Sequence, residues 1–306
     1  MRIVFMGTPD YSVKTLDALM TAGHEVVAVF AQPDKPVGRK QILTPPPVKQ
    51  RAEELGIPCY QPTTLRDGAA LSILQELDPE VIVVVAYGKI LPKEILELPP
   101  LGCVNGHASL LPRHRGASPI QWAIVCGDKQ TGVTTMLMDE GMDTGDILDT
   151  AVTDIGEQET AEELFERLSA ISANLMVSTL KGLQDGTVTP KKQNENKATY
   201  APIIKKEMAH IDFNKTADEI CNAVRGYYSW PCAFCILDGK RLKVMSAISA
   251  TGSGNIGEVI DNTDSLKVAC KDGAVEFLTV QLEGSRAMSA SEMLRGKGIA
   301  LGTVLV

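Results

Sequence analysis

The stretch Arg2-Ile3-Val4-Phe5-Met6-Gly7-Thr8-Pro9-Asp10 determines the fold class of this chain. It is an apolar, β-branched run that ends directly at a Gly-Thr-Pro turn, as a buried strand does. Apolar residues then recur at helical spacing from Val13 to Met20, and a second apolar run covers residues 25–31. This order of strand, turn, helix and strand predicts the start of an open parallel sheet, and therefore an α/β fold.

Two loops are predicted beside this sheet. The segment 32–50 contains five prolines and one glycine, which disfavours the interior of a helix or strand. We predict a long loop there, and long ordered loops are often functional. Residues 81–86 form a near-continuous apolar run, typical of a strand that is covered on both faces. The segment 87–92 is then the loop at the carboxyl end of that strand.

The remaining patterns divide the chain into a first domain over 1–189, a linker over 190–206 and a second domain over 207–306. The linker is polar and lysine-rich and follows a long amphipathic helix predicted at 160–183. Short strands separated by glycine turns follow it, which is typical of a small antiparallel barrel. The other expected helices cover 49–55, 69–77, 119–126 and 217–224. The other expected strands cover 58–60, 102–107, 132–138, 232–237, 241–247, 256–261, 265–269 and 274–281, with a closing strand over 298–306.

The composition is that of a globular chain. Of the 306 residues, 44% are hydrophobic and 22% are charged, so a sizeable core can be buried. No apolar stretch approaches the 18 or so residues of a membrane span, and the amino-terminal run is too short for a signal peptide. We therefore expect a cytoplasmic protein without membrane contact. Because no heptad pattern or apolar surface stripe is visible, we expect a monomer.

Seven cysteines are scattered along the chain. Cys232 and Cys235 form a Cys-x-x-Cys pair, but no second pair or histidine lies nearby for zinc. The alternating apolar residues around them indicate a strand. A structural role is favoured, with a redox or metal role as the alternative.

The net charge of −8 is unevenly distributed. Residues 1–189 carry 15 basic and 25 acidic side chains, whereas residues 190–306 carry 15 and 13. The last third is therefore the less repulsive surface for a polyanion. Each of two basic clusters is either a solvated face or a phosphate-binding surface. One cluster comprises Lys35, Arg39, Lys40, Lys49 and Arg51, and the other Lys191, Lys192, Lys197, Lys205 and Lys206.

The richest chemistry lies in residues 103–121. An apolar strand ends at Asn105, His107 and Ser109, and a period of two places these three side chains on one side. They lie where a parallel strand meets its loop, which is where open α/β sheets bind ligands. An amide donor and an imidazole can together stabilise an oxyanion that forms on a carbonyl. The alternative is that Asn-Gly-His is turn chemistry.

A second polar stretch covers residues 138–147, where four carboxylates surround two glycines after a strand. Such a turn can aim one carboxylate at the imidazole and so help to deprotonate an attacking amine. The alternative is a solvated loop or a weak cation site. The turn at Gly7 does not match the dinucleotide-binding pattern, and no P-loop or hydrolase motif is present. The residues alone indicate an α/β enzyme that acts on a carbonyl or an amine, with a second β domain.

Asn105, His107, the run Ser109–Pro112 and Asp143 in this order resemble the folate-dependent formyltransferases. Within that family, further stretches resemble the branch that acts on methionyl initiator tRNA. These are residues 5–10, 32–39, 112–121 and 139–145, and, more loosely, Arg225-Gly226 and Trp230-Pro231. The similarity thus runs from residue 3 through the linker into the second domain.

The resemblance implies a Rossmann-like, mostly parallel first domain and an OB-like carboxyl-terminal β-barrel. It implies transfer of a formyl group from 10-formyltetrahydrofolate to the α-amino group of methionyl initiator tRNA, with Asn105, His107 and Asp143 as catalytic residues and no metal. The implied folate-binding residues are Tyr87, Gly88, Lys89, Ile90, Leu91, Ser109, Leu110, Leu111 and Pro112. The implied tRNA-binding residues are Lys35, Arg39, Lys40, Lys191, Lys192, Lys205 and Lys206.

Two positions depart from the family pattern. Gly106 replaces a residue that is usually apolar, and His114 stands where an aromatic is common. For His114 we considered stacking, a phosphate contact or plain solvent exposure. Two other functions share parts of this pattern: a formyltransferase for sugar nucleotides or other small amines, and a non-catalytic RNA-binding protein. The former has no need of the 32–50 loop, and the intact Asn105, His107 and Asp143 argue against the latter.

Overall fold

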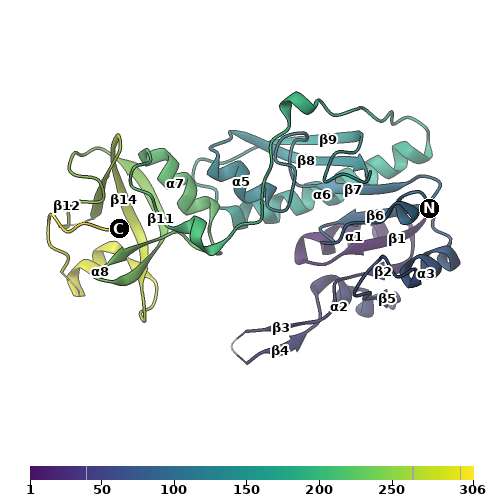
Figure 1. The fold of residues 1–306 in the computed structure, drawn as a ribbon, viewed down its shortest axis with the longest axis horizontal. Coiled ribbons are helices and arrows are strands. Elements are labelled where there is room, and N and C mark those ends of the chain that lie inside the picture. The colour runs from purple at the N-terminus through teal and green to yellow at the C-terminus, as the bar shows by residue number, and fades with distance from the viewer. Residues whose placement is uncertain (39, 264, 297) are drawn as a thin grey trace. The chain divides into compact units, whose positions relative to one another are not determined.

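The first sheet of the computed structural model has seven strands, and most of them are parallel (Figure 1). Neighbouring strands from β5 to β7 are parallel, whereas β8 runs antiparallel to β7. The order is β5 (Cys59–Tyr60), β2 (Glu25–Phe30), β1 (Arg2–Gly7), β6 (Val81–Val85), β7 (Cys103–His107), β8 (Gln130–Leu137) and β9 (Ile147–Asp154). The Rossmann-like, mostly parallel sheet is therefore confirmed, although β9 was not expected.

Helices pack against the apolar strands of this sheet. They are α1 (Asp10–Thr21), α2 (Pro47–Glu54), α3 (Ala69–Leu77), α4 (Lys93–Leu96) and α6 (Ala161–Gln184). Every residue of β6 is buried, as the uninterrupted apolar run predicted. On one face, Val84 and Met6 form a core with Leu74 of α3 and Ile95 of α4. The short helix α4 was not expected.

The structure describes residues 1–38, 40–263, 265–296 and 298–306. These residues form two compact units, which are described separately. The first comprises residues 1–116, 131–153 and 165–200, and the second comprises residues 117–130, 154–164 and 201–306. The division into domains at 189 and 206 stays a prediction.

The segment 32–50 is not a continuous loop, and that prediction was wrong. It contains an antiparallel hairpin of β3 (Lys35–Val37) and β4 (Ile42–Thr44), which extends away from α2 (Figure 1). Proline is tolerated here because a two-stranded ribbon leaves outward N–H groups unpaired in any case. Gly38 and Gln41 both adopt positive φ angles, which allows the chain to reverse direction. The hairpin keeps Val37, Ile42 and Leu43 more than half exposed.

The second unit contains an antiparallel sheet, as the strand and turn pattern predicted. Its order is β10 (Phe234–Leu237), β11 (Lys240–Ala250), β14 (Gly273–Leu282), β13 (Leu266–Cys270) and β12 (Val259–Asp261), and β15 (Met288–Ser289) pairs with β14. Its helices are α5 (Pro119–Val125), α7 (Ala217–Gly226) and α8 (Ala290–Gly296). Short 3-10 turns cover Glu195–Lys197 in the first unit and Lys206–Ala209 in the second.

The closing strand expected over 298–306 is replaced by a tail of isolated contacts. Within the described part of this segment, Val304 forms a single bridge with Glu258. The tail nevertheless joins both edges of the sheet. The amide of Val259 donates to the carbonyl of Thr303 at 2.8 Å, and the amide of Val306 donates to the carbonyl of Ile236 at 3.2 Å. These bonds close the sheet into the expected barrel without a regular strand.

The seven cysteines are free thiols. Cys232 and Cys235 are both buried, and burial raises the pKa of Cys235 to about 12. A thiol that holds its proton so firmly is a poor nucleophile and a poor metal ligand, so the structural interpretation of this pair is favoured. No helix among the described residues combines the length and the apolar character needed to cross a bilayer.

Candidate active site

The end of β7 carries the first two candidate catalytic residues. Asn105 lies between Val84 of β6 and Met136 of β8, and it is half-buried. Its side chain shares a face with that of His107, because alternate residues of a strand point the same way. The described residues place no hydrogen-bond partner on the Asn105 side-chain amide. An amide in this position is open to a ligand.

Asp143 approaches His107 from a loop 36 positions further along the chain. Its Oδ2 lies 3.6 Å from Nδ1 of His107, and both side chains are largely buried. The same oxygen accepts a hydrogen bond of 2.8 Å from the amide of Gly116. Nε2 of His107 lies 2.9 Å from the carbonyl oxygen of His114. The structure thus brings together the three residues for which the sequence suggested a catalytic role.

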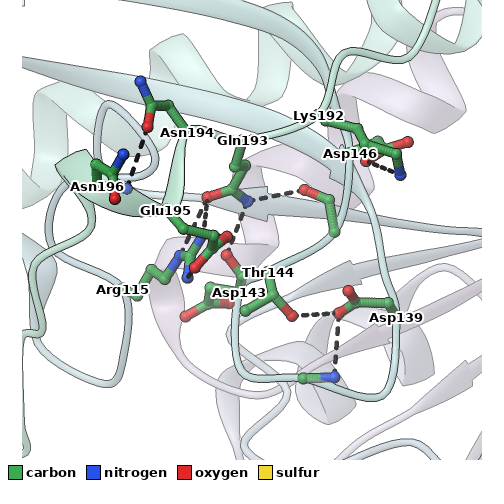
Figure 2. Close-up of polar contacts among 12 residues, drawn as sticks. Arg115, Asp139, Asp143, Thr144, Asp146, Lys192, Gln193, Asn194, Glu195 and Asn196 are labelled. Atoms are coloured by element: carbon green, nitrogen blue, oxygen red, sulfur yellow. Dashed lines mark hydrogen bonds and ion pairs between the residues drawn. The ribbon is translucent and has the colours of Figure 1, made fainter.

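The acidic loop distinguishes Asp143 from its three neighbouring carboxylates. Asp139 is used inside the turn, where Oδ1 accepts from the amide of Gly141 at 3.1 Å and from Thr144 Oγ1 at 2.6 Å (Figure 2). Glu140 is exposed and lies 3.9 Å from Lys93, and Asp146 lies 3.5 Å from Lys192. Asp143 is therefore the carboxylate of this loop that reaches the imidazole.

Gly145 allows the loop to approach the end of β8 closely. A Cβ atom at this position would lie 1.6 Å from the carbonyl oxygen of Leu137, which no side chain can tolerate. The amide of Leu137 also donates to the carbonyl of Asp146 at 2.9 Å, so the loop is pinned at its base. Asp143 itself has a φ angle of 55°, a left-handed conformation that costs free energy for a residue with a Cβ.

Three residues that the sequence did not assign lie behind this site. His114 is buried, which excludes plain solvent exposure, one of the three alternatives considered for it. Arg115 is also buried, and its guanidinium contacts Gln193 and Glu195. The amide of Arg115 donates to the carbonyl of Thr199 at 2.8 Å. Gln193 lies in the polar segment after α6, where no periodicity distinguishes it from its neighbours.

The loop 87–91, expected to bind folate, starts at the carboxyl end of β6. The carbonyl of Tyr87 accepts hydrogen bonds from Thr8 Oγ1 at 3.0 Å and from Gln32 Nε2 at 3.1 Å. Nε2 of Gln32 also donates to the carbonyl of Gly88 at 3.1 Å. This loop is therefore held from the ends of β1 and β2, at the edge where parallel sheets bind ligands.

The side chains of this loop differ in their surroundings. The hydroxyl of Tyr87 is buried without a hydrogen-bond partner among the described residues, and burial raises its pKa to about 12. Leu91 is buried, whereas Ile90 is exposed. Lys89 Nζ donates to the carbonyls of Pro62 and Thr63 at 2.5 and 2.6 Å. Burial and the charge of Lys35 lower the pKa of Lys89.

The run 109–112 forms the turn after β7. Ser109 Oγ donates to the carbonyl of Arg113 at 2.7 Å, which closes the turn on itself. Thr134 Oγ1 bridges the turn by donating to the carbonyl of Ser109 and accepting from the amide of Leu111. Leu111 is buried, Leu110 is half-buried, and the carbonyl of Pro112 accepts from the amide of Thr199 at 3.2 Å.

The basic residues are only partly available to phosphates. Lys49 pairs with Asp34 at 3.0 Å, and Arg51 pairs with Asp17 at 2.7 Å. Lys35 and Lys40 are exposed on the β3–β4 hairpin, and Arg39 lies outside the described residues. The second cluster is divided, since Lys191 and Lys192 belong to the first unit and Lys205 and Lys206 to the second. All four are exposed.

No group of three or more His, Cys, Asp or Glu side chains within the described residues is arranged to hold a metal ion.

Comparison with known proteins identifies a family for both parts of the chain. The profile of the formyl transferase family matches residues 1–180, and that of the formyl transferase carboxyl-terminal domain matches residues 203–298. Solved structures share the fold. HypX from Aquifex aeolicus in complex with tetrahydrofolic acid aligns with a TM-score of 0.65 at 18% identity over 98% of this chain and 48% of that chain. Methionyl-tRNA formyltransferase from Clostridium thermocellum aligns with a TM-score of 0.57 at 23% identity over 92% of this chain and 98% of that chain.

A curated relative is similar along nearly its whole length. The methionyl-tRNA formyltransferase of Magnetococcus marinus is 49% identical over 302 residues, which are 98% of this chain and 97% of that protein. The match therefore includes the end of β7, the acidic loop and the barrel. This chain belongs to the formyl transferase family, in its methionyl-tRNA formyltransferase branch.

Proposed function

We propose that this protein transfers the formyl group of 10-formyltetrahydrofolate to the α-amino group of methionyl initiator tRNA, for translation initiation. Family membership along the whole chain supports the substrates. The observation that carries the chemistry is the approach of Asp143 Oδ2 to within 3.6 Å of His107 Nδ1, beside the end of the strand that bears Asn105. This arrangement places an amide, an imidazole and a carboxylate at one edge of a parallel sheet.

In this mechanism the methionyl amine attacks the formyl carbon and forms a new C–N bond. The carbonyl oxygen becomes an oxyanion, which accepts hydrogen bonds from the Asn105 amide and from Nδ1–H of protonated His107. Asp143 accepts the proton that the amine loses, directly or through water. Collapse of the tetrahedral intermediate breaks the bond between carbon and N10 of the folate, and that nitrogen takes up the proton. The products are formylmethionyl-tRNA and tetrahydrofolate.

The folate is proposed to lie along the loops after β6 and β7, at residues 87–91 and 109–112. Both loops end parallel strands at the same edge of the sheet as Asn105. The tRNA is proposed to contact Lys35 and Lys40 on the hairpin, Arg39, and the lysines at 191, 192, 205 and 206. Lys35 and Lys40 stand beside exposed apolar side chains of the same hairpin, a combination suited to phosphates and splayed bases. We also propose that the protein acts as a monomer in the cytoplasm.

One assay tests this function against its rivals. The purified protein is incubated with 10-formyltetrahydrofolate and either methionyl initiator tRNA or small amines, among them methionine and amino sugars. We expect the tRNA to acquire the formyl group, and an Asp143→Asn variant to transfer it much more slowly. Formylation of a small amine with the tRNA untouched would favour a small-amine formyltransferase. Binding of tRNA without any transfer would favour a non-catalytic RNA-binding protein.

A further inference from the structure

The loop that carries Asp143 is held in place by residues far along the chain. We propose that Gln193 and Arg115 are positioning residues, which fix the backbone of this loop so that the Asp143 carboxylate faces His107. The proposal rests on the role that the proposed function gives to Asp143. It concerns residues of the first compact unit alone.

Gln193 connects the loop to Arg115 through its side-chain amide. Nε2 donates to the carbonyls of Asp143 and Gly145, each at 2.8 Å (Figure 2). Oε1 accepts from Nη2 and Nε of Arg115 at 2.7 and 3.1 Å. One side chain thus satisfies two carbonyls of the acidic loop and two donors of a guanidinium.

The chemistry of the four partners allows a single orientation of this amide. A guanidinium has donors and no acceptor, so it requires the oxygen of Gln193. The two backbone carbonyls only accept, so they require the NH2 group. If the amide were flipped, its NH2 group would face the donors of Arg115 and its oxygen would face the two backbone carbonyls. Glutamate at this position is nearly the same size and keeps the contact with Arg115, but it places a second oxygen against the two carbonyls.

Arg115 is itself fixed from several sides. Its side chain is fully buried and forms a bidentate ion pair with Glu195. Nη1 donates to Oε2 at 2.8 Å, and Nη2 donates to Oε1 at 2.7 Å. This carboxylate raises the pKa of Arg115, so the guanidinium stays charged. The Arg115 amide bonds to Thr199, and the next amide, that of Gly116, donates to Asp143 Oδ2. Arg115 therefore supports Asp143 by two routes, one through its own side chain and one through its neighbour's backbone.

The contacts from Gln193 and Gly116 hold Asp143 in an unfavourable backbone conformation. Asp143 adopts a left-handed conformation at φ 55°, and such a residue persists only when its surroundings hold it. Gln193 bonds to the carbonyl of Asp143, and Gly116 bonds to its side chain. Loss of the Gln193 contacts frees the loop to relax, and a shift of about 1 Å in a catalytic group can cost about 10²-fold in rate.

The test is a double-mutant cycle on the full chain with Gln193→Glu and Asp143→Asn. Turnover of methionyl initiator tRNA is measured for the wild type, both single variants and the double variant. We expect Gln193→Glu to lower kcat by about 10²-fold, with KM for both substrates nearly unchanged. In the Asp143→Asn background the same change should cost less than about threefold, because residues that act through one another are not additive. Asn196→Ala, at an exposed amide of the same segment, is the matched control and should leave kcat unchanged.

The outcomes separate the inference from the proposed function. If Asp143→Asn turns over like the wild type, the proposed role of Asp143 fails. If Asp143→Asn is slow but Gln193→Glu costs the same factor in both backgrounds, Gln193 does not act through Asp143 and the inference is overturned. A rise in KM with unchanged kcat overturns it as well. Thermal unfolding of each variant checks folding, and Gln193→Leu replaces Gln193→Glu in the cycle if the latter does not fold.

Discussion

Nε2 of His107 lies 2.9 Å from the carbonyl oxygen of His114, whereas Nδ1 of the same ring lies 3.6 Å from Asp143 Oδ2. A carbonyl only accepts hydrogen bonds, so Nε2 must carry a hydrogen. The hydrogen bond to His114 then fixes the position of the imidazole ring. The separation at Nδ1 is too long for a hydrogen bond, yet close enough for an ion pair. Nδ1 is therefore the ring atom that can meet an incoming oxygen, with the carboxylate beside it.

The Asn105 amide should stabilise the oxyanion. Replacing Asn105 with Ala removes one donor, and we expect kcat to fall by about 10²–10³-fold. Asn105→Asp should be at least as slow, because it sets a negative charge where an oxyanion forms. Steady-state kinetics with charged initiator tRNA measure both. Turnover like that of the wild type in Asn105→Ala would remove Asn105 from the mechanism.

The close approach at Gly145 should make this position intolerant of a side chain. A Cβ there would meet the Leu137 carbonyl at 1.6 Å, so Gly145→Ala must displace the acidic loop. We expect a loss of about 1–3 kcal/mol in the free energy of unfolding, as for other overpacked sites, and a fall in kcat. Gly296→Ala is the control, since beyond its chain neighbours and its own helix backbone no atom of the described residues lies within 4 Å of its Cβ position. Equal melting temperatures for the two variants would contradict this account.

The space between β7 and α6 should limit the size of side chain that position 106 tolerates, where this chain has glycine and the family usually has an apolar residue. A Cβ at Gly106 would lie 3.0 Å from Ser172 Oγ and 3.4 Å from Met176 Cε, both on α6. We expect Gly106→Ala to be nearly neutral, because removing a strand glycine gains about 0.5–1 kcal/mol and offsets the small displacement. Gly106→Val should destabilise the fold by about 1–3 kcal/mol. Adding Ser172→Ala to Gly106→Val should recover part of that loss, as urea unfolding can show.

The hairpin lysines should act on the tRNA and not on the folate. Replacing Lys35 and Lys40 with Ala should raise KM for methionyl initiator tRNA and lower the salt dependence of binding by about one unit of slope per lysine. KM for 10-formyltetrahydrofolate should not change. Arg39→Ala should likewise weaken the use of tRNA far more than the use of folate. Unchanged tRNA kinetics in these variants would refute the assignment of the hairpin.

The ion pair between Asp34 and Lys49 should stabilise the fold at neutral pH. This contribution should be lost in acid, where the Asp34 carboxylate is protonated. Hydrogen bonds from Gln61 and then Lys49 hold the pKa of Asp34 below its usual range. A carboxyl with a lowered folded-state pKa contributes stability above its unfolded pKa of about 3.9, and loses it as the pH falls through the folded value. Asp34→Asn should therefore be less stable than the wild type at pH 7 and show a smaller difference near pH 3. A difference that did not depend on pH would contradict this.

Much of the first sheet and of the site could be predicted because local patterns determine them. The apolar run of β6 and the alternation at the end of β7 indicated buried strands, and a period of two placed Asn105 and His107 on one face. Among the four carboxylates of the acidic loop, periodicity did not select Asp143. The resemblance to the family did, and the structure shows what the other three do instead: Asp139 serves the turn, Glu140 lies near Lys93, and Asp146 lies near Lys192.

The features that were missed depend on contacts across the chain. Gln193 lies in a polar segment that resembles a linker, and its partners at 115, 143 and 145 are 48 or more residues away. The β3–β4 hairpin was missed because prolines disfavour strands in general, yet a solvated ribbon tolerates them. The tail after α8 closes the barrel with separate backbone bonds and thus shows no strand periodicity.

The tether at Gln193 also has a consequence for the order of events during synthesis. Strands β1, β2, β6 and β7 are complete once residue 107 has been made, and the acidic loop follows about 40 residues later. The amide that ties this loop down is not yet present at that point. At about 5–20 residues per second, several seconds pass before residue 193 is added. A nascent chain in that interval holds a nearly finished sheet but lacks the Gln193 contacts to the loop of Asp143, so catalytic competence arrives after most of the sheet has formed.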